Sequence, residues 1–431
     1  MHAPGRFRTL GGAVSLLLAA GPGAGLATGP VRVQQAAPLA LSDSAVVSLV
    51  TVLPGRRLYS LFGHTVIRVR DPATGLDVGF NYGTFDFPET PLGGAGFVAR
   101  FAYGRLDYAL SVQGDPIGSV RRYWRDESRP SVEQVLALTP EQARGLFRAL
   151  AANARPENRT YRYDFFFDNC ATRPRDVIEA ALGGRLRSRL ADPGTSFRRL
   201  LDPYLVGVPL LDLGMDLGLG PPADRIASAR QALFLPEWLM EWASAAVVET
   251  PGGVRPLVAR TDTLTWGPEA AERNPAPPWP THLAWILCGP VLLLSLADAR
   301  AGRRGRRGLD GLLLTGLGAL GLLLAFLAFV SLHAVTRGNL NLLWAAPTHL
   351  VAGVVLLAGG RPRWLRPYMA AAFAAAVVFL VGWPAWPQEI PAAVLPVVLA
   401  LLARAWLLAL PAAEDQGEGK AVSQAGEASS S

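Results

Sequence analysis

The chain has 431 residues, half of them hydrophobic, and carries a formal net charge of +7. This apolar composition argues against a single soluble domain. Lys420 is the only lysine, so the basic charge comes almost entirely from arginine, and no dense basic stripe precedes residue 282. We therefore expect no nucleic-acid partner.

The N-terminus has the layout of a secretory signal peptide. Arg6 and Arg8 are followed by an apolar stretch over 10–20 and then by small residues that end near Ala27. We predict that residues 1–27 form the signal peptide, with cleavage near Ala27. An uncleaved anchor is the alternative, and either interpretation exports the residues that follow.

The sequence becomes strongly apolar from about residue 282 onward. Most of its apolar spans approach the roughly 20 residues that a transmembrane helix needs. The chain is therefore predicted to contain an all-α membrane domain of five helices over 282–410. The expected spans are 282–297, 309–332, 340–358, 367–386 and 390–410.

The arginines between these spans predict the topology. Five lie at 300–307 and three at 361–366, whereas the alternate loops hold only Arg337. The positive-inside rule places both arginine-rich loops in the cytoplasm, together with a disordered tail over 411–431. The region before residue 282 is then outside, in agreement with the signal peptide. Arg404, near the cytoplasmic end of the last span, is expected to extend its charge to the interface.

Residues 28–264 are long enough for one substantial exported core, and 265–281 form a proline-rich linker. Alternating apolar residues predict strands, and Thr139-Pro140 predicts a helix start. The exported domain is therefore predicted to be α+β. The expected elements are a strand over 45–53, a hairpin of 64–70 and 78–87, helices over 140–153 and 173–182, helical segments near 196–205 and 223–245, and a hairpin around 251–253.

The exported region contains one cysteine, Cys170, and one histidine, His64. The only other cysteine, Cys288, lies in an apolar span, so Cys170 has no obvious disulfide partner. A free thiol in an oxidising compartment invites oxidative damage unless the protein uses it. We therefore expect a nucleophilic Cys170 with His64 as its base.

Cys170 lies just before a predicted helix, where the helix dipole and free N–H groups favour a thiolate. The same N–H groups can hold an oxyanion on an attacked carbonyl. Arg173 and Arg175 add positive charge that either lowers the thiol pKa or binds a phosphate. The alternative is that both are solvent-exposed arginines on a helix.

A third polar group is needed to orient the His64 imidazole. By strand alternation His64 shares the polar face of its strand. Asn81, Thr84 and Asp86 lie on the partner strand of the predicted hairpin. We favour Asn81, although the sequence does not fix which of these side chains faces His64.

Two further features have alternative explanations. The aromatic residues near His64 and at 165–167 form either an acyl-binding groove or ordinary core. His333 and Asn339, in the loop after the second span, either complete a substrate site or cap helices. One histidine, one cysteine and no clustered carboxylates in the exported part predict no metal site and no cofactor.

These motifs together resemble the Lnb family. The resemblance is carried, in the same order along the chain, by FGH (62–64), NYGTFDF (81–87), DFFFDNCATR (164–173), FLPE (234–237), and His333 with NLNLLW (339–344). It implies a circularly permuted papain-like thiol-enzyme domain, similar to lecithin:retinol acyltransferase-like and NlpC-like proteins. The family nucleophile corresponds to Cys170 and its base to His64.

The resemblance also implies an activity. Members of this family are lipoprotein N-acyltransferases of bacterial envelopes. The expected protein is multi-pass in the inner membrane, with its catalytic domain on the periplasmic side. A phospholipid is the expected acyl donor and a lipoprotein the acceptor, with a Cys170 thioester between them. The alternatives are an NlpC-like cell-wall amide hydrolase and a non-catalytic envelope binding or sensor protein.

Overall fold

The computed structural model describes residues 40–85, 91–267 and 278–410, which belong to two compact units. The first unit combines Met1–Gly194 with Ala227–Glu272, and the second combines Thr195–Ile226 with Arg273–Ser431. The predicted signal peptide, most of the linker and the C-terminal tail lie outside the described residues.

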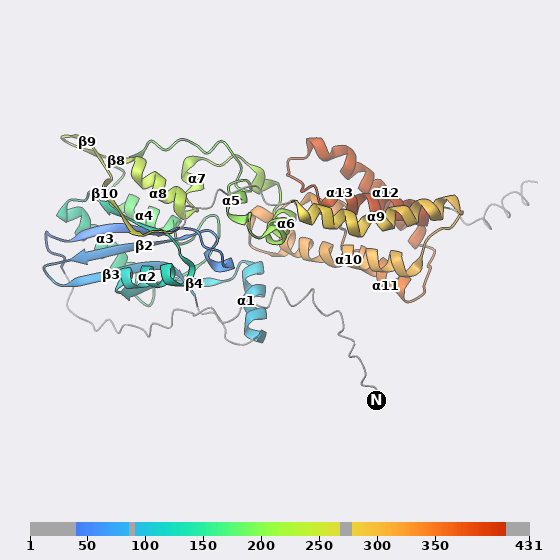
Figure 1. The fold of residues 1–431 in the computed structure, drawn as a ribbon, viewed down its shortest axis with the longest axis horizontal. Coiled ribbons are helices and arrows are strands. Elements are labelled where there is room, and N and C mark those ends of the chain that lie inside the picture. Colours follow the sequence, from blue (N-terminus) through green and yellow to red (C-terminus); the bar gives the residue numbers. More distant parts are fainter. Residues whose placement is uncertain (1–39, 86–90, 268–277, 411–431) are drawn as a thin grey trace, which may run out of the picture. The chain divides into compact units, whose positions relative to one another are not determined.

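A seven-stranded antiparallel sheet forms the centre of the first unit (Figure 1). Its strand order is β10-β5-β1-β2-β3-β4-β6. The strands are β1 Val46–Val52, β2 His64–Asp71, β3 Leu76–Thr84, β4 Asp107–Gly114, β5 Ser131–Leu136, β6 Thr160–Arg162 and β10 Val258–Thr265. A smaller sheet pairs β7 Leu186–Ser188, β8 Ala246–Thr250 and β9 Gly253–Pro256. The α+β prediction for this domain is confirmed.

Helices cover both faces of the large sheet. Ile67 and Val69 of β2 are fully buried in a core that includes residues of α3, α4 and α8, while Val66 packs on the other face with Val120 of α2. The helical segments of this unit are η2 Leu58–Ser60, α1 Pro91–Tyr103, α2 Pro116–Glu127, α3 Pro140–Asn153, α4 Thr172–Ala181, α7 Ala229–Ala232 and α8 Pro236–Ala245.

The local signals in the sequence predict several of these elements closely. Thr139 caps α3, with its side chain accepting the Gln142 N–H, and the helix ends at Asn153 as expected. The 64–70 and 78–87 hairpin forms as β2 and β3 around a turn at 72–75. The helical segments expected near 223–245 form as a 3-10 turn, η3 (Pro221–Asp224), followed by α7 and α8, and Pro236 begins the last of them.

The second unit consists mainly of apolar helices. Among the described residues, three helices are long and apolar enough to cross a membrane: 279–300, 307–330 and 365–385. Val394–Ala409 is a shorter apolar helix. The elements are α5 Asp202–Leu205, α6 Pro209–Gly218, η3 Pro221–Asp224, α9 Trp279–Arg300, α10 Arg307–Ala325, η4 Phe326–Val330, η5 Ala334–Thr336, η6 Leu340–Leu343, α11 His349–Leu357, α12 Leu365–Gly382, η7 Trp383–Ala385 and α13 Val394–Ala409.

The third apolar span is not one continuous helix, which corrects the prediction for 340–358. Only α11, nine residues long, is α-helical there, and η6 is a separate 3-10 turn before it. At about 1.5 Å per residue, α11 is too short to span a bilayer by itself. Buried Asn341 accounts for the turn, because its side chain binds the Trp344 indole N–H and the Leu217 carbonyl.

Thr195–Ile226, which lies within the expected exported domain over 28–264, belongs to the second unit. Polar contacts explain this assignment. The Gly220 N–H donates to the Val335 carbonyl at 2.8 Å, and the Asn339 side chain donates to the Leu217 carbonyl at 2.7 Å. A segment that sequence position assigns to the exported domain is therefore bonded to the helical unit.

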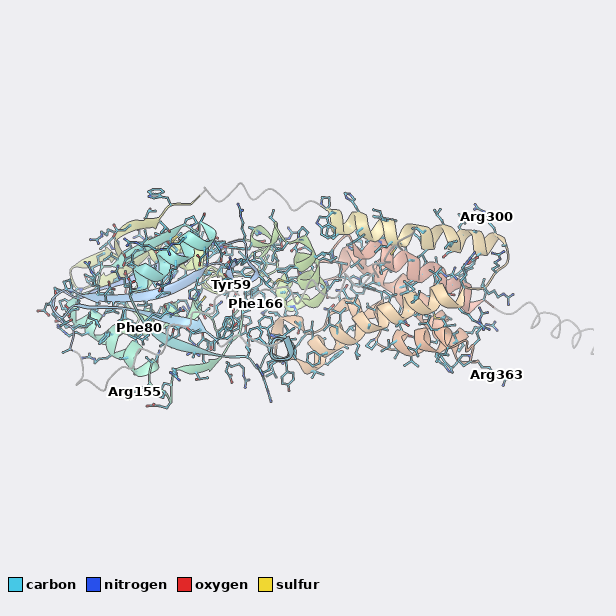
Figure 2. The ribbon with its side chains drawn as sticks, turned by 60° about the horizontal axis from the view of Figure 1, so that its bottom comes forward. Tyr59, Phe80, Arg155, Phe166, Arg300 and Arg363 are labelled. Atoms are coloured by element: carbon cyan, nitrogen blue, oxygen red, sulfur yellow. The ribbon has the colours of Figure 1, made fainter. Side chains whose placement is uncertain are left out.

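Arg404 does not extend to the interface as the sequence analysis expected. It is 1% exposed and forms ion pairs with Asp310 of α10 and Asp298 of α9, at 2.5 and 3.0 Å. A buried charge is stable only when it is paired, so this cluster holds α9, α10 and α13 together. Figure 2 shows Arg300 and Arg363, from the two arginine-rich connections, at the same end of the helical unit.

Candidate active site

Cys170 lies one residue before Ala171, the N-cap of α4. Asn169 holds this turn, because its Oδ1 accepts the N–H groups of Ala171 and Thr172 at 2.8 and 3.0 Å. Its Nδ2 donates to the carbonyls of Phe165 and Phe234 at 2.7 and 2.9 Å. The Asn-Cys-Ala-Thr sequence is therefore a side-chain-capped turn that presents Cys170 ahead of the helix.

His64 begins β2 and pairs with Val52 of β1. Its Nε2 lies 2.7 Å from Asn81 Oδ1. An amide oxygen accepts only, so Nε2 carries the proton in this pair and Nδ1 is left unprotonated as a base. The sheet register explains the contact: Arg68 pairs with Gly79, which puts His64 and Asn81 on the same face of the sheet.

Gly83 shows that Cys170 and His64 border one small space. A methyl group at Gly83 would lie 3.3 Å from Cys170 Cβ and 3.6 Å from His64 Cε1. Gly83 also has a φ of +94°, a conformation that glycine adopts without steric cost. The backbone of β3 therefore comes close to Cys170 and His64 at Gly83, which has no side chain.

Both groups of the pair are neutral near pH 7. Burial lowers the pKa of His64 to about 4, against a smaller opposing effect of the Asn81 hydrogen bond, and the Arg129 charge lowers it further. Burial raises the pKa of the Cys170 thiol to about 11, although the residue as a whole is partly exposed. The sequence predicts a more acidic thiol. That prediction was wrong because the effect of burial outweighs the effects of the backbone N–H groups and of the Arg129 charge.

Two backbone N–H groups approach the thiol. Hydrogen bonding from the N–H groups of Thr65 and Cys170 itself opposes the effect of burial on the Cys170 pKa. Donors that can stabilise a thiolate can also stabilise the oxyanion that forms when the sulfur attacks a carbonyl. The site therefore brings together the Cys170 thiol, the His64 imidazole bonded to Asn81, and two backbone N–H groups near the sulfur.

Aromatic side chains connect the chain segments that precede His64 and Cys170. Phe62 packs edge-on against Phe165 with ring centroids 4.8 Å apart, and Phe165 and Phe166 both contact Phe234. Phe166 and Phe234 are buried core residues, whereas Phe167 is 43% exposed. Tyr59 and Phe166 lie toward the same end of the first unit (Figure 2). Most of these aromatic side chains thus pack against one another, and Phe167 lies at the exposed edge of the cluster.

The two predicted arginines near Cys170 are engaged in local contacts. Arg173 forms a bidentate ion pair with Asp168, at 2.6 and 2.8 Å, and its guanidinium lies 3.8 Å from the centre of the Tyr161 ring. Arg175 is buried and donates to Asp176 at 2.8 Å. Neither is therefore a freely exposed arginine on a helix.

The two predicted residues in the membrane part belong to the second unit. His333 is partly exposed, and its carbonyl accepts the Thr336 hydroxyl at 2.9 Å. Asn339 is buried: Nδ2 donates to the Leu217 and Gly218 carbonyls, and Oδ1 accepts the Asn341 N–H. These bonds cap the η6 turn and connect it to the end of α6 at Leu217 and Gly218.

Three contributors to the site were not predicted from the sequence: Thr65, Arg129 and Asn169. Arg129 is 3% exposed, donates from Nε to the Leu53 carbonyl at 2.9 Å, and lowers the pKa values of both His64 and Cys170. Only long-range packing brings Arg129 to the site, so no local pattern identifies it. The position of Asn169 immediately before Cys170 and a helix start is a signal that capping rules recognise.

Two protein-family matches identify the family of the chain. Residues 35–203 match the Lnb N-terminal periplasmic domain, and residues 272–414 match the Lnb transmembrane domain. The chain belongs to the Lnb family. It is a membrane protein with several transmembrane helices and a periplasmic N-terminal domain. No match was found among curated proteins or among solved structures.

The two matches divide the predicted site residues of this Lnb-family protein. The periplasmic match contains His64, Asn81, Cys170, Arg173 and Arg175. The transmembrane match contains His333 and Asn339. Among the described residues, no group of three or more His, Cys, Asp or Glu side chains is placed to hold a metal ion.

Proposed function

We propose that this protein is a lipoprotein N-acyltransferase that works through a Cys170 thioester. The observation that carries the proposal is the convergence of Cys170, His64 and Asn81 in a periplasmic domain that the same chain joins to a transmembrane domain. A thiol enzyme anchored in a membrane has access to lipid esters as donors, whereas soluble cell-wall substrates require no membrane domain.

In the first half-reaction, His64 Nδ1 takes the Cys170 proton as the sulfur attacks the acyl carbonyl of a phospholipid. The N–H groups of Thr65 and Cys170 stabilise the resulting oxyanion. When the ester bond breaks, the imidazolium returns its proton to the leaving glycerol oxygen. The products are a lysophospholipid and an acyl thioester on Cys170.

In the second half-reaction, the free α-amine of a lipoprotein's lipidated N-terminal cysteine attacks the thioester. His64 accepts a proton from that amine, and the departing Cys170 sulfur recovers it. The acceptor leaves with a new amide bond, and the enzyme returns to its neutral state. Two steps on one thiol allow donor and acceptor to bind in succession.

We also propose that the periplasmic domain is a circularly permuted papain-like fold. The support is an antiparallel sheet that carries His64 and Asn81, against which α4 packs with Cys170 just before its N-terminus. His64 precedes Cys170 in the chain, which is the reverse of the papain order. We further assign Arg173, Arg175, His333 and Asn339 to substrate binding, directly or by shaping the loops that receive the lipids.

The test is to express the chain in a bacterium that lacks lipoprotein N-acylation and to record mass spectra of lipoprotein N-terminal peptides. We expect the mass of one acyl chain on the terminal amine. Cys170→Ala and His64→Ala should abolish it at equal protein levels, whereas Cys288→Ala, which removes the other thiol, should not.

Two other results would replace the proposal. Unchanged lipoproteins with cleaved cell-wall peptides, dependent on Cys170, would identify an amide hydrolase. No change in either pool, with well-folded protein in the membrane, would identify a non-catalytic envelope protein.

A further inference from the structure

A second feature of the periplasmic domain lies outside the Cys170 site. It is an open surface cavity of about 570 Å³, lined mainly by exposed residues, between α1, the connection that follows it, β4 and β6. Arg100, Arg105, Arg162 and Asp107 line it, together with Ala99 and Tyr103. Three guanidinium groups and one carboxylate give the cavity a net positive charge.

The fold brings these residues together from separate parts of the chain. Arg100 lies in the last turn of α1 and Arg105 just after that helix, where its guanidinium lies 5.0 Å from the centre of the Tyr103 ring. Asp107 of β4 is the sheet partner of Arg162 in β6. The sheet register therefore fixes one side of the cavity and α1 the other.

The three arginines are exposed at the surface of the domain. Among the described residues, Arg68, Arg173 and Arg198 all form ion pairs, but no ion pair involves Arg100, Arg105 or Arg162. Like charges gathered around one cavity repel each other, and a bound anion removes that cost. The planar donors of arginine match the oxygens of a phosphate group.

Apolar residues beside the cavity indicate where such a phosphate comes from. Val98 and Phe101, one helical turn apart on α1, are 55% and 41% exposed. Figure 1 shows α1 projecting from the sheet instead of lying along its face. Basic residues next to exposed apolar residues on a helix are typical of contact with an anionic lipid surface.

We infer that this cavity binds the phosphodiester headgroup of an anionic phospholipid, with Val98 and Phe101 in contact with its acyl region. The strands that line the cavity also carry Tyr108 and Tyr161, neighbours of Asp107 and Arg162. Burial and the nearby Cys170 sulfur raise the pKa of both phenols. The headgroup site thus lies on strands that also border the thiol.

The test uses the full-length chain with Cys170→Ala, purified in detergent and stripped of lipid, so that no bound lipid is consumed. Native mass spectrometry measures the binding of phosphatidylglycerol, of diacylglycerol with the same chains, and of inorganic phosphate. Arg100→Gln, Arg105→Gln and Arg162→Gln are combined in one variant. The control combines Arg70→Gln, Arg148→Gln and Arg155→Gln, exposed arginines of the same domain.

We expect the cavity variant to bind phosphatidylglycerol about tenfold or more weakly, and the control to bind it as the parent does. Diacylglycerol should bind weakly to all three proteins. Val98→Ser with Phe101→Ser should weaken phosphatidylglycerol but leave inorganic phosphate unchanged. This last result distinguishes a lipid headgroup from free phosphate.

Equal binding of phosphatidylglycerol by the cavity variant and the control would overturn the proposal. Arginine-dependent binding of inorganic phosphate without phosphatidylglycerol would assign the cavity to a soluble ligand and would also overturn it. The readout is binding and not turnover. A failure to detect N-acylation therefore leaves this result intact.

Discussion

Asn81 Oδ1 lies 2.7 Å from His64 Nε2 and thereby selects which imidazole nitrogen is free to act as a base. Asn81 is 4% exposed, so water competes little for its amide. The hydrogen bond also raises the pKa of His64 against the larger lowering effect of burial. Asn81 therefore orients the His64 imidazole and keeps it more basic than burial alone would allow.

We expect Asn81→Ala to lower turnover by up to about 10²-fold, less than the loss of the base itself, which typically costs about 10²–10⁴. The acid limb of the pH–rate profile should move to lower pH, because the hydrogen bond that raises the His64 pKa is gone. Asn153→Ala is the control, since Asn153 Nδ2 donates to the Tyr82 hydroxyl on the same strand as Asn81. Equal effects of the two substitutions would contradict an orienting role.

The pKa values predict how the thiol reacts with an alkylating agent. With Cys170 at about 11 and His64 at about 4, the resting site holds a thiol and not a thiolate–imidazolium pair. In a Cys288→Ala background, the rate of alkylation by iodoacetamide should keep rising with pH up to about 11. A rate that already levels off near pH 6 would mean that the pair is ionised at rest.

The pKa values of His64 and Cys170 also predict that the folded protein loses stability at both low and high pH. The unfolded chain takes up a proton at His64 below about pH 6.5, but the folded protein does so only near 4, so stability falls as pH decreases between these values. The unfolded chain loses the Cys170 proton near pH 9 and the folded protein near 11, so stability also falls as pH rises through that range. Thermal unfolding of wild type and of Cys170→Ala should diverge above pH 9.

Gly83 and Gly75 provide a matched pair of substitutions. Both have positive φ, +94° and +73°, so alanine at either costs roughly 1–2 kcal/mol of backbone strain. A methyl at Gly75 meets nothing within 4 Å, whereas one at Gly83 crowds Cys170 and His64. Both variants should unfold at lower temperature, but only Gly83→Ala should lose turnover, by more than about tenfold. Full activity in Gly83→Ala would mean that the reacting groups lie elsewhere.

The comparison of sequence with structure separates local signals from long-range ones. The cap of α3 at Thr139 and the β2–β3 hairpin depend on neighbouring residues, and both form as predicted. The approach of His64 to Asn81 depends on strand register. The sequence leaves Asn81, Thr84 and Asp86 as possible partners of His64, and the pairing of β2 with β3 selects Asn81. Arg129 reaches the site only through the packing of β5 against β1, so it could not be predicted.

The difference between local and long-range signals also explains which features of the membrane domain were predicted. Hydropathy locates the apolar spans but does not show that Asn341 interrupts the third with a turn. Its charge alone predicted that Arg404 lies at the membrane interface. The two acidic partners that bury it lie on other helices, 94 and 106 residues away in the sequence. Partners that distant leave no pattern around residue 404.

The pairing of Arg404 with Asp298 and Asp310 gives the last prediction. Asp298 also pairs with Arg306, so Arg404→Leu leaves buried Asp310 without its counter-charge, which typically costs about 3–5 kcal/mol. Thermal unfolding of the full chain in detergent should show this loss, and Arg363→Leu, at an exposed arginine, should not. Adding Asp310→Asn to Arg404→Leu should recover part of the stability, because the unpaired carboxylate is removed with its partner. If the double variant is no more stable than Arg404→Leu, then lost packing around the arginine, and not uncompensated charge, governs the stability of these helices.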